Sequence, residues 1–119
     1  IQQACQETAQ YLALHLEELK VFDMLSKGED LPVLAFGLKD TVRHFSVFDL
    51  SDRLRMNGWQ VPAYTLPKNC ENMAVLRIVV KENLSRDLAD NLLNDIKREL
   101  AWFAKNPGTP EEPKPMFHH

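Results

Sequence analysis

Long apolar runs, paired cysteines and an excess of positive charge are all missing from this 119-residue sequence. No apolar stretch approaches the roughly 20 residues that a membrane-spanning helix needs, and no basic-then-apolar signal peptide opens the chain. With 14 Lys and Arg against 17 Asp and Glu, the net charge is −3. This balance gives no electrostatic reason for binding nucleic acid or an anionic membrane, so we expect neither as a partner.

Cysteine is scarce too: the chain holds two, Cys5 and Cys70, far apart and in no CxxC pair. We expect both to be free thiols in a reducing cytoplasm, and we expect no metal site. A glycine-rich phosphate loop, a nucleophile elbow and an HExxH motif are likewise missing. The acidic residues are predicted to lie on solvated helix faces, with no pair singled out by its spacing. The chain therefore lacks the pattern of a self-sufficient active site.

Length and composition predict one domain and a short tail. At 119 residues, with 45% hydrophobic and 26% charged residues, the chain suits one globular domain with a modest core. Four prolines lie between residues 107 and 119, a stretch with too little apolar surface to fold alone. We therefore predict a domain over residues 1–105 and a flexible, proline-rich tail over residues 106–119. The chain opens on Ile1 rather than Met, which is consistent with a piece of a longer protein.

Apolar periodicity and turn residues predict seven elements in the order α-β-β-α-β-β-α. The predicted helices cover residues 3–19, the stretch between Ser46 and Gly58, and residues 86–104; the predicted strands cover residues 21–25, 31–38, 59–64 and 73–80. The first two strands are expected to form a hairpin whose turn is built around Gly28. Helices that pack on one face of a small, mainly antiparallel sheet form an α+β two-layer sandwich, which is the predicted fold class.

The most clearly marked part of the pattern is the helix, stop and strand around Gly58. Ser46 is a predicted N-cap with Asp49 three residues later, and Gly58 supplies the left-handed residue that ends the helix. The following residues alternate as a strand does, although Pro62 cannot donate to a ladder and indicates an edge or a bulge. The last helix is expected to start at a Ser85 cap and to bury one stripe of side chains: Leu88, Leu92, Ile96, Leu100 and Phe103.

Arg77 is the residue best suited to bind a ligand. It interrupts the apolar run of residues 73–80, and an arginine in such a run needs a partner for its charge. Its planar guanidinium matches a carboxylate in two hydrogen bonds, so at the edge of a cleft it would hold an acidic substrate. A structural salt bridge to Asp or Glu across the sheet explains the same residue equally well. The pattern leaves both alternatives open.

The histidines carry weaker signals. His15 is expected to be a surface or boundary residue of the first helix, and His44 lies in a connector without a spaced partner. His118 and His119 are suited to a pH-sensing tip, because histidine titrates near neutrality. A remnant of cloning or a disordered chain end is the simpler interpretation of these last two residues.

Several segments taken together resemble one known family. They read Phe-Asp-Leu-Ser at 48–51, Leu-Arg at 54–55, Gly-Trp-Gln-Val-Pro-Ala-Tyr-Thr-Leu-Pro at 58–67, Val-Leu-Arg-Ile-Val-Val at 75–80 and Asn-Leu-Ser-Arg-Asp-Leu-Ala at 83–89. In this combination and spacing, residues 1–104 closely resemble the C-terminal domain of glutamate decarboxylase, a group II pyridoxal-phosphate-dependent decarboxylase. The segment at 58–67 together with the Leu-Arg-Ile strand is a specific signal.

The resemblance implies a function and its division between domains. It implies a fold-type-I enzyme that converts L-glutamate into 4-aminobutyrate and CO₂ with pyridoxal phosphate. It also implies that Arg77 binds a substrate carboxylate, and that the cofactor lysine and the other catalytic and cofactor-binding residues belong to a large domain outside this chain. By the same resemblance, the isolated chain is expected to be inactive and the full enzyme to be a cytoplasmic homo-oligomer assembled through its large domain.

The tail departs from the family pattern. Plant members continue into a calmodulin-binding segment, which needs a basic amphipathic helix with an aromatic anchor. Residues 107–119 hold four prolines and a single lysine, so we expect no calmodulin binding. Some bacterial members plug the active site at neutral pH with a tail that bears a histidine near its end, a role for which His118 and His119 are candidates.

Two other functions fit the sequence. One is a stand-alone α+β module that binds an acidic ligand or a partner without catalysis, since such folds serve many roles. The other is a decarboxylase of the same group that acts on a different amino acid, because the determinants of side-chain choice lie mostly outside this chain. Only the closeness of the match from Trp59 to Leu66 favours glutamate.

Overall fold

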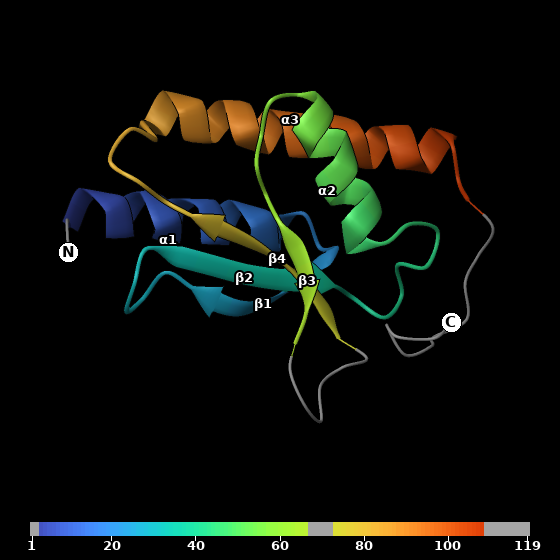
Figure 1. Ribbon diagram of the computed structural model, residues 1–119, viewed down its shortest axis with the longest axis horizontal. Helices are drawn as coiled ribbons and strands as arrows, with labels where there is room; N and C mark the ends of the chain where they lie inside the picture. Colours follow the sequence, from blue (N-terminus) through green and yellow to red (C-terminus); the bar gives the residue numbers. More distant parts are fainter. Residues whose placement is uncertain (1–2, 67–72, 109–119) are drawn as a thin grey trace.

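Helices cover one face of a small sheet in the computed structural model, which describes residues 3–66 and 73–108 (Figure 1). The helices of this part are α1 (Gln3–Glu18), α2 (Val47–Met56) and α3 (Arg86–Lys105), and the strands are β1 (Phe22–Lys27), β2 (Val33–Leu38), β3 (Ala63–Thr65) and β4 (Ala74–Val79). The predicted element order and the α+β class are confirmed. None of these helices combines the length and the apolar character that spanning a bilayer requires.

The sheet has the strand order β1-β2-β4-β3, and every neighbouring pair is antiparallel. Ala35 of β2 lies opposite Arg77 of β4, and Val33 lies opposite Val79. Because side chains alternate along a strand, these four residues share the face that points away from the helices, here called the outer face. Ile78 lies between Arg77 and Val79 on β4, and it is buried on the other face.

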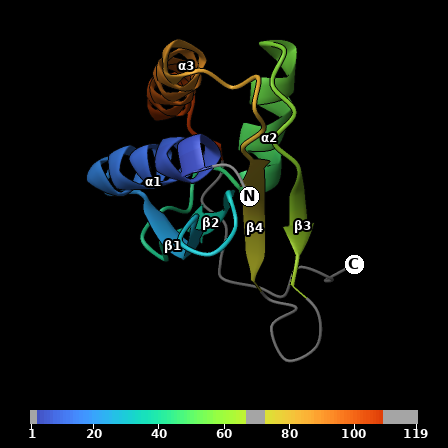
Figure 2. The ribbon, with the colours of Figure 1, turned by 90° about the vertical axis from the view of Figure 1, so that its left-hand side faces the viewer.

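The core lies between the sheet and the helices. In Figure 2, α1 lies over β1 and β2, α2 lies over the β3–β4 side, and α3 runs along both helices. Side chains from every helix and from the two inner strands are fully buried there, and each contributes about 1.5–3 kcal/mol by leaving water. The largest of them are Phe36, Leu12, Leu16, Leu34, Leu50, Leu54, Leu76, Leu92 and Ile96.

Both ends of α2 form as predicted. The Ser46 side chain accepts a hydrogen bond from the Asp49 amide at 3.1 Å, and the Asp49 carboxylate accepts one from the Ser46 amide at 2.9 Å. This reciprocal capping box satisfies two N–H groups that a helix start leaves unpaired. Gly58 follows the last turn with φ +88°, the left-handed conformation that glycine adopts without steric cost.

A second glycine sets the turn between β1 and β2. Gly28 has φ +78°, and a Cβ added there would lie 2.6 Å from the Cβ of Ala9 on α1. The turn therefore passes so close to the helix that a side chain would clash, while the left-handed backbone independently favours glycine. This contact presses the hairpin onto α1 and confirms the predicted turn around Gly28.

The prediction of a strand over residues 59–64 is wrong at its start, because β3 begins only at Ala63. The Trp59 amide donates to the carbonyl of Leu54 at the end of α2, at 3.0 Å, instead of to a strand. Pro62 has no N–H to donate, although its carbonyl accepts from the Arg77 amide at 3.0 Å. Residues 59–62 therefore form an irregular connection, and Figure 1 shows it passing beside α3 before it enters the sheet.

Two side chains of α3 also differ from the prediction. Leu88, expected in the buried stripe, is 42% exposed because it lies in the first turn of the helix beside an open hollow. Glu99, expected on a solvated face, is only 4% exposed. Its carboxylate accepts from Arg53 Nε at 2.6 Å and from Asn57 Nδ2 at 2.9 Å, and these bonds offset the cost of burying a charge.

A polar contact also joins α1 to α3. The Tyr11 hydroxyl donates to Asp90 Oδ1 at 2.5 Å, and the Arg86 guanidinium lies 3.9 Å from the centre of the Tyr11 ring. The hydrogen bond to the Asp90 carboxylate raises the pKa of Tyr11 above its ordinary value, because it stabilises the protonated hydroxyl. α3 ends at Lys105, close to the predicted boundary, and the division into domain and tail stays a prediction.

Candidate functional site: a cationic cleft around Arg77

Arg77 lies on β4 with its side chain on the outer face. Its neighbours Leu76 and Ile78 point into the core, so strand alternation carries the arginine out of the apolar run in which the sequence places it. The guanidinium therefore reaches solvent without the cost of burying a charge. Its backbone is fixed between Ala35 of β2 and the Pro62 carbonyl.

A cleft of about 520 Å³ opens beside Arg77. It lies where three parts of the fold meet: one side of α2, the irregular connection that follows it, and the end of β4. The residues that line it are Ser51, Arg55, Trp59, Gln60, Val61, Pro62, Arg77, Val79 and Lys81. The structure thus places Arg77 at a cleft, as the ligand-binding interpretation of the sequence requires.

The charged residues among the described lining of the cleft are all positive. Arg55, Arg77 and Lys81 contribute to its wall, and no acidic residue of the described chain does. Arg55 is already paired with the Asp52 carboxylate. Within residues 3–66 and 73–108, neither Arg77 nor Lys81 has a carboxylate within ion-pair distance. In the part of the chain that the structure describes, the structural salt bridge considered for Arg77 does not form, and the cleft is suited to an anion.

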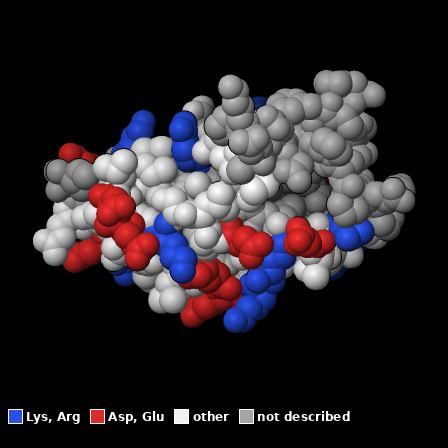
Figure 3. All heavy atoms as spheres, turned by 90° about the horizontal axis from the view of Figure 1, so that it is seen from below, with Lys and Arg blue, Asp and Glu red and all other residues white. Residues whose placement is uncertain are grey.

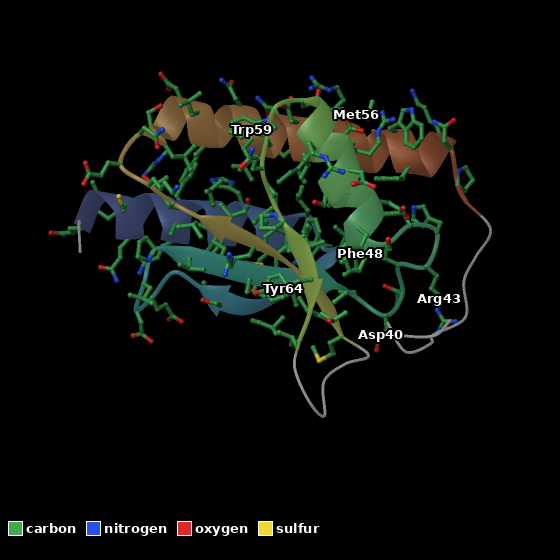
Figure 4. All side chains as sticks on the ribbon, viewed as in Figure 1. Asp40, Arg43, Phe48, Met56, Trp59 and Tyr64 are labelled. Atoms are coloured by element: carbon green, nitrogen blue, oxygen red, sulfur yellow. The ribbon has the colours of Figure 1, made fainter. Side chains whose placement is uncertain are left out.

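Tyr64 is the aromatic neighbour of Arg77. It lies on β3, where its label appears in Figure 4, and it pairs with Val75 on β4. Its ring centre lies 5.7 Å from the central guanidinium carbon of Arg77, near the outer limit of a cation–π contact. A phenol ring at this distance attracts the guanidinium only weakly.

The face of the molecule that Figure 3 shows carries charges of both signs. Figure 3 views the molecule from the side opposite the helices, and there acidic and basic side chains intermingle along one edge. Much of the remaining described surface in that view is uncharged. An extended basic patch of the kind that binds nucleic acid is not seen among the described residues of this face.

The other candidate residues do not join the cleft. His15 Nδ1 lies 2.9 Å from Glu18 on the same helix, as a boundary residue would, and His44 contacts the Phe45 ring edge-on at 4.9 Å. Cys5 is a buried free thiol. Among the described residues no group of three or more His, Cys, Asp or Glu is placed to hold a metal. Cys70, His118 and His119 lie outside the described residues.

Sequence reasoning missed Arg55 and Lys81. Lys81 follows Arg77 by four residues, so the two-residue period of a strand already places both on one face. That signal was available in the sequence. Arg55 comes from α2, and only the folding of the chain brings it to the cleft, so no spacing could have assigned it.

Comparison with known proteins was made on sequence and on structure. The chain matches no family model. Glutamate decarboxylase from Aliivibrio fischeri is 40% identical to it over the whole chain, a region that makes up 27% of that relative. Glutamate decarboxylase from Petunia hybrida is 43% identical over 84% of the chain and 20% of the relative. The matched regions are C-terminal.

The chain belongs to the glutamate decarboxylase family and corresponds to its C-terminal part. The solved glutamate decarboxylase of Lactobacillus brevis superposes with a TM-score of 0.80 and 36% identity, over 83% of this chain and 23% of that one. The resemblance inferred from the segments at 58–67 and 75–80 is thereby confirmed.

Two further comparisons set the limits of this assignment. An 8-amino-7-oxononanoate synthase from Francisella tularensis superposes with a TM-score of 0.61 at 19% identity, a likeness that shows the fold alone. The chain spans about a quarter of the length of the glutamate decarboxylases it matches.

Proposed function

We propose that this chain is the small C-terminal domain of an enzyme that converts L-glutamate into 4-aminobutyrate and CO₂. One observation carries the proposal: Arg77 lies at a cleft lined by cations and has no carboxylate partner among the described residues. Glutamate is a dicarboxylate, and a free guanidinium is the group best matched to bind one of its carboxylates. The reaction is taken from the names of the relatives, which are glutamate decarboxylases. The cleft supports it, because its charge suits a carboxylate of glutamate.

In this proposal Arg77 donates two parallel hydrogen bonds to a substrate carboxylate. Lys81 raises the positive potential of the cleft and so favours the entry of an anion, whereas the charge of Arg55 is largely compensated by Asp52. Val79 and Pro62 add apolar surface beside the guanidinium. Together these groups bind and orient the substrate.

Pyridoxal phosphate, when bound, supplies the electron sink for the loss of CO₂. The described residues of the cleft do not fit this cofactor, because none of them is an acid that could pair with its ring nitrogen. We therefore assign cofactor binding and the cofactor lysine to the large domain of the same polypeptide. By itself, the chain is expected to be inactive.

The outer face also suits contact with that large domain. Val79 is 46% exposed and lies opposite Val33 on the same face, and Leu25 of β1 is 45% exposed. Apolar surface of this kind is costly to leave in water. We infer that it packs against the large domain, which would place the cleft between the two. Assembly into a homo-oligomer through the large domain and a cytoplasmic location belong to the same proposal.

Substitutions of Arg77 in the full-length enzyme test its role. Arg77→Ala removes hydrogen bonds to a charged group, and the loss of even one is worth about 1.5–3 kcal/mol, so kcat/KM for L-glutamate is expected to fall by at least about 10- to 150-fold. Arg77→Lys keeps the positive charge but loses the planar guanidinium that forms two parallel hydrogen bonds, so it is expected to retain only part of the activity. Arg43→Ala is the matched control, because Arg43 lies in the exposed connector before α2 and, among the described residues, bonds only a backbone carbonyl.

The expected pattern is a large loss for Arg77→Ala, a smaller loss for Arg77→Lys and none for Arg43→Ala. Equal kinetics for Arg77→Ala and Arg43→Ala would remove Arg77 from the site. The assay is the formation of 4-aminobutyrate over a range of L-glutamate concentrations.

A further inference from the structure

The wall of the cleft opposite β4 is formed by residues 59–62, here called the wall segment. It belongs to no helix or strand, so no regular ladder sets its position. Its two ends are held by backbone bonds, from the Trp59 amide to Leu54 and from the Arg77 amide to the Pro62 carbonyl, both at 3.0 Å. The second bond ties the wall segment to the backbone of Arg77 itself.

Side chains hold the rest of the wall segment. Trp59 Nε1 donates to Asp95 Oδ2 on α3 at 2.6 Å, and the Ser51 hydroxyl on α2 donates to the Val61 carbonyl at 2.6 Å. The Asp95 side chain is only 18% exposed, and its other oxygen is bound by Arg98 on the next turn of α3. Asp95 therefore presents a fixed acceptor to the indole. Figure 4 marks Trp59 on this connection, beside α3.

Open space lies behind the wall segment as well as in front of it. A second hollow of about 330 Å³ is bounded by the wall segment and by apolar side chains of β4 and α3, among them Ile78, Leu88 and Leu92. Close packing holds the middle of the wall segment, because the Val61 side chain is buried in the core with 4% exposed. Trp59 is only partly buried and borders both hollows, so its position depends more on the hydrogen bond that its indole makes.

We propose that Asp95 is a positioning residue of the cleft. It does not line the cleft, and it acts through Trp59: by holding the indole it fixes the part of the wall segment that faces Arg77 across the cleft. The inference rests on the proposed function, in which the cleft binds a carboxylate of the substrate. A binding group must be held within about half an ångström of its working position, so a wall that moves weakens binding.

Variants of the full-length enzyme separate this role from a merely structural one. Asp95→Ala removes the acceptor, Asp95→Asn keeps an oxygen that accepts from the indole, and Trp59→Phe removes the donor while keeping a ring. Asp87→Ala is the matched control, because Asp87 is an exposed acid in the first turn of the same helix. Each variant is assayed for KM and kcat with L-glutamate and for its melting temperature.

We expect Asp95→Ala and Trp59→Phe each to raise KM for L-glutamate at least fivefold, with a smaller change in kcat. Asp95→Asn is expected to stay within twofold of the wild-type KM, and the control to stay at the wild-type value. The double variant Asp95→Ala with Trp59→Phe is expected to have the same KM as each single variant, because both substitutions remove the same hydrogen bond. If Asp95→Ala does not fold, Trp59→Phe and Asp95→Asn carry the same comparison.

Three results would overturn the inference. The first is a KM within twofold of wild type for both Asp95→Ala and Trp59→Phe, and the second is additive effects in the double variant. The third is a loss of thermal stability with no change in KM, which would make the bond a structural staple only. Measuring Arg77→Ala in the same series separates the two proposals: if it raises KM and Asp95→Ala does not, the positioning role alone fails. If neither changes KM, or if the wild-type enzyme does not act on glutamate, both fail.

Discussion

The Arg77 guanidinium carbon lies 5.7 Å from the centre of the Tyr64 ring, on the outer face of the sheet. An exposed cation–π contact contributes about 0.5–1 kcal/mol, which corresponds to about a two- to fivefold change in an equilibrium constant. Tyr64→Leu is therefore expected to raise KM for L-glutamate by about this factor in the full-length enzyme. Tyr64→Phe keeps the ring and is expected to stay close to wild type.

The order of the two variants is the informative part of this comparison. If Tyr64→Phe weakened glutamate binding as much as Tyr64→Leu, the hydroxyl and not the ring would be the group that matters. Steady-state kinetics over the same substrate range as for the Arg77 variants measures both.

The nearly buried pair of Arg53 and Glu99 makes a prediction about stability. Arg53 Nε donates to Glu99 at 2.6 Å, and its guanidinium also lies 3.7 Å from the centre of the Trp102 ring. Glu99→Ala leaves this arginine without its carboxylate and is expected to destabilise the domain by about 2–4 kcal/mol. Urea unfolding followed by near-ultraviolet circular dichroism, which reports on Trp102, measures the loss.

Replacing both partners is the matched test of this explanation. Arg53→Met combined with Glu99→Leu removes the charges together, so no unpaired charge stays near the core. The double variant is expected to be more stable than Glu99→Ala. A double variant that is as unstable as the single one would show that packing, and not the unpaired charge, carries the effect.

Gly28 and Gly58 differ in a way that separates strain from steric clash. Both have positive φ, but a Cβ on Gly28 would lie 2.6 Å from Ala9, whereas a Cβ on Gly58 would meet nothing within 4 Å. Gly58→Ala is expected to cost about 1–2 kcal/mol for the left-handed backbone alone. Gly28→Ala is expected to cost at least about 1 kcal/mol more, because the clash adds to the strain. Chemical denaturation of the two variants side by side measures the difference, and equal losses would contradict the close approach of the turn to α1.

The tail carries the pH-dependent prediction. If His118 and His119 help to plug the active site when they lose their protons, deleting residues 107–119 from the full-length enzyme extends activity toward neutral pH. Replacing both histidines with alanine is expected to reproduce the effect with the tail still present. The measurement is the pH profile of 4-aminobutyrate formation. A profile that the deletion leaves unchanged sinks the regulatory role, and the two histidines are then a passive chain end.

Local signals predicted much of this fold. The capping box at Ser46, the stop at Gly58, the Ser85 cap and the hairpin turn at Gly28 each depend on interactions within a few residues, and each forms in the structure. Arg77 was found because its charge stands out in an apolar run, and strand alternation accounts for its place on the outer face. The resemblance to glutamate decarboxylase then indicated which ligand Arg77 would bind, a carboxylate of L-glutamate.

The features that sequence reasoning missed depend on distant partners. Residues 59–62 alternate like a strand, yet Asp95 on another helix and the end of α2 supply the bonds that hold them. Glu99 looks like a surface acid until α2 brings Arg53 to it. The cleft has the same origin, since Arg55 reaches it only after α2 has packed beside the sheet. Such contacts have no fixed spacing in a sequence, so periodicity cannot reveal them.

One measurement tests the central claim most directly: product formation from L-glutamate by the full-length protein that contains residues 1–119, with pyridoxal phosphate present. We predict that the full-length protein forms 4-aminobutyrate and CO₂ in equal amounts, that it prefers L-glutamate to other amino acids, and that residues 1–119 alone form none. Turnover of a different amino acid would keep the family and change the substrate. No decarboxylation by the full-length protein, together with saturable binding of glutamate by residues 1–119 alone, would contradict the enzyme and favour a stand-alone binding module.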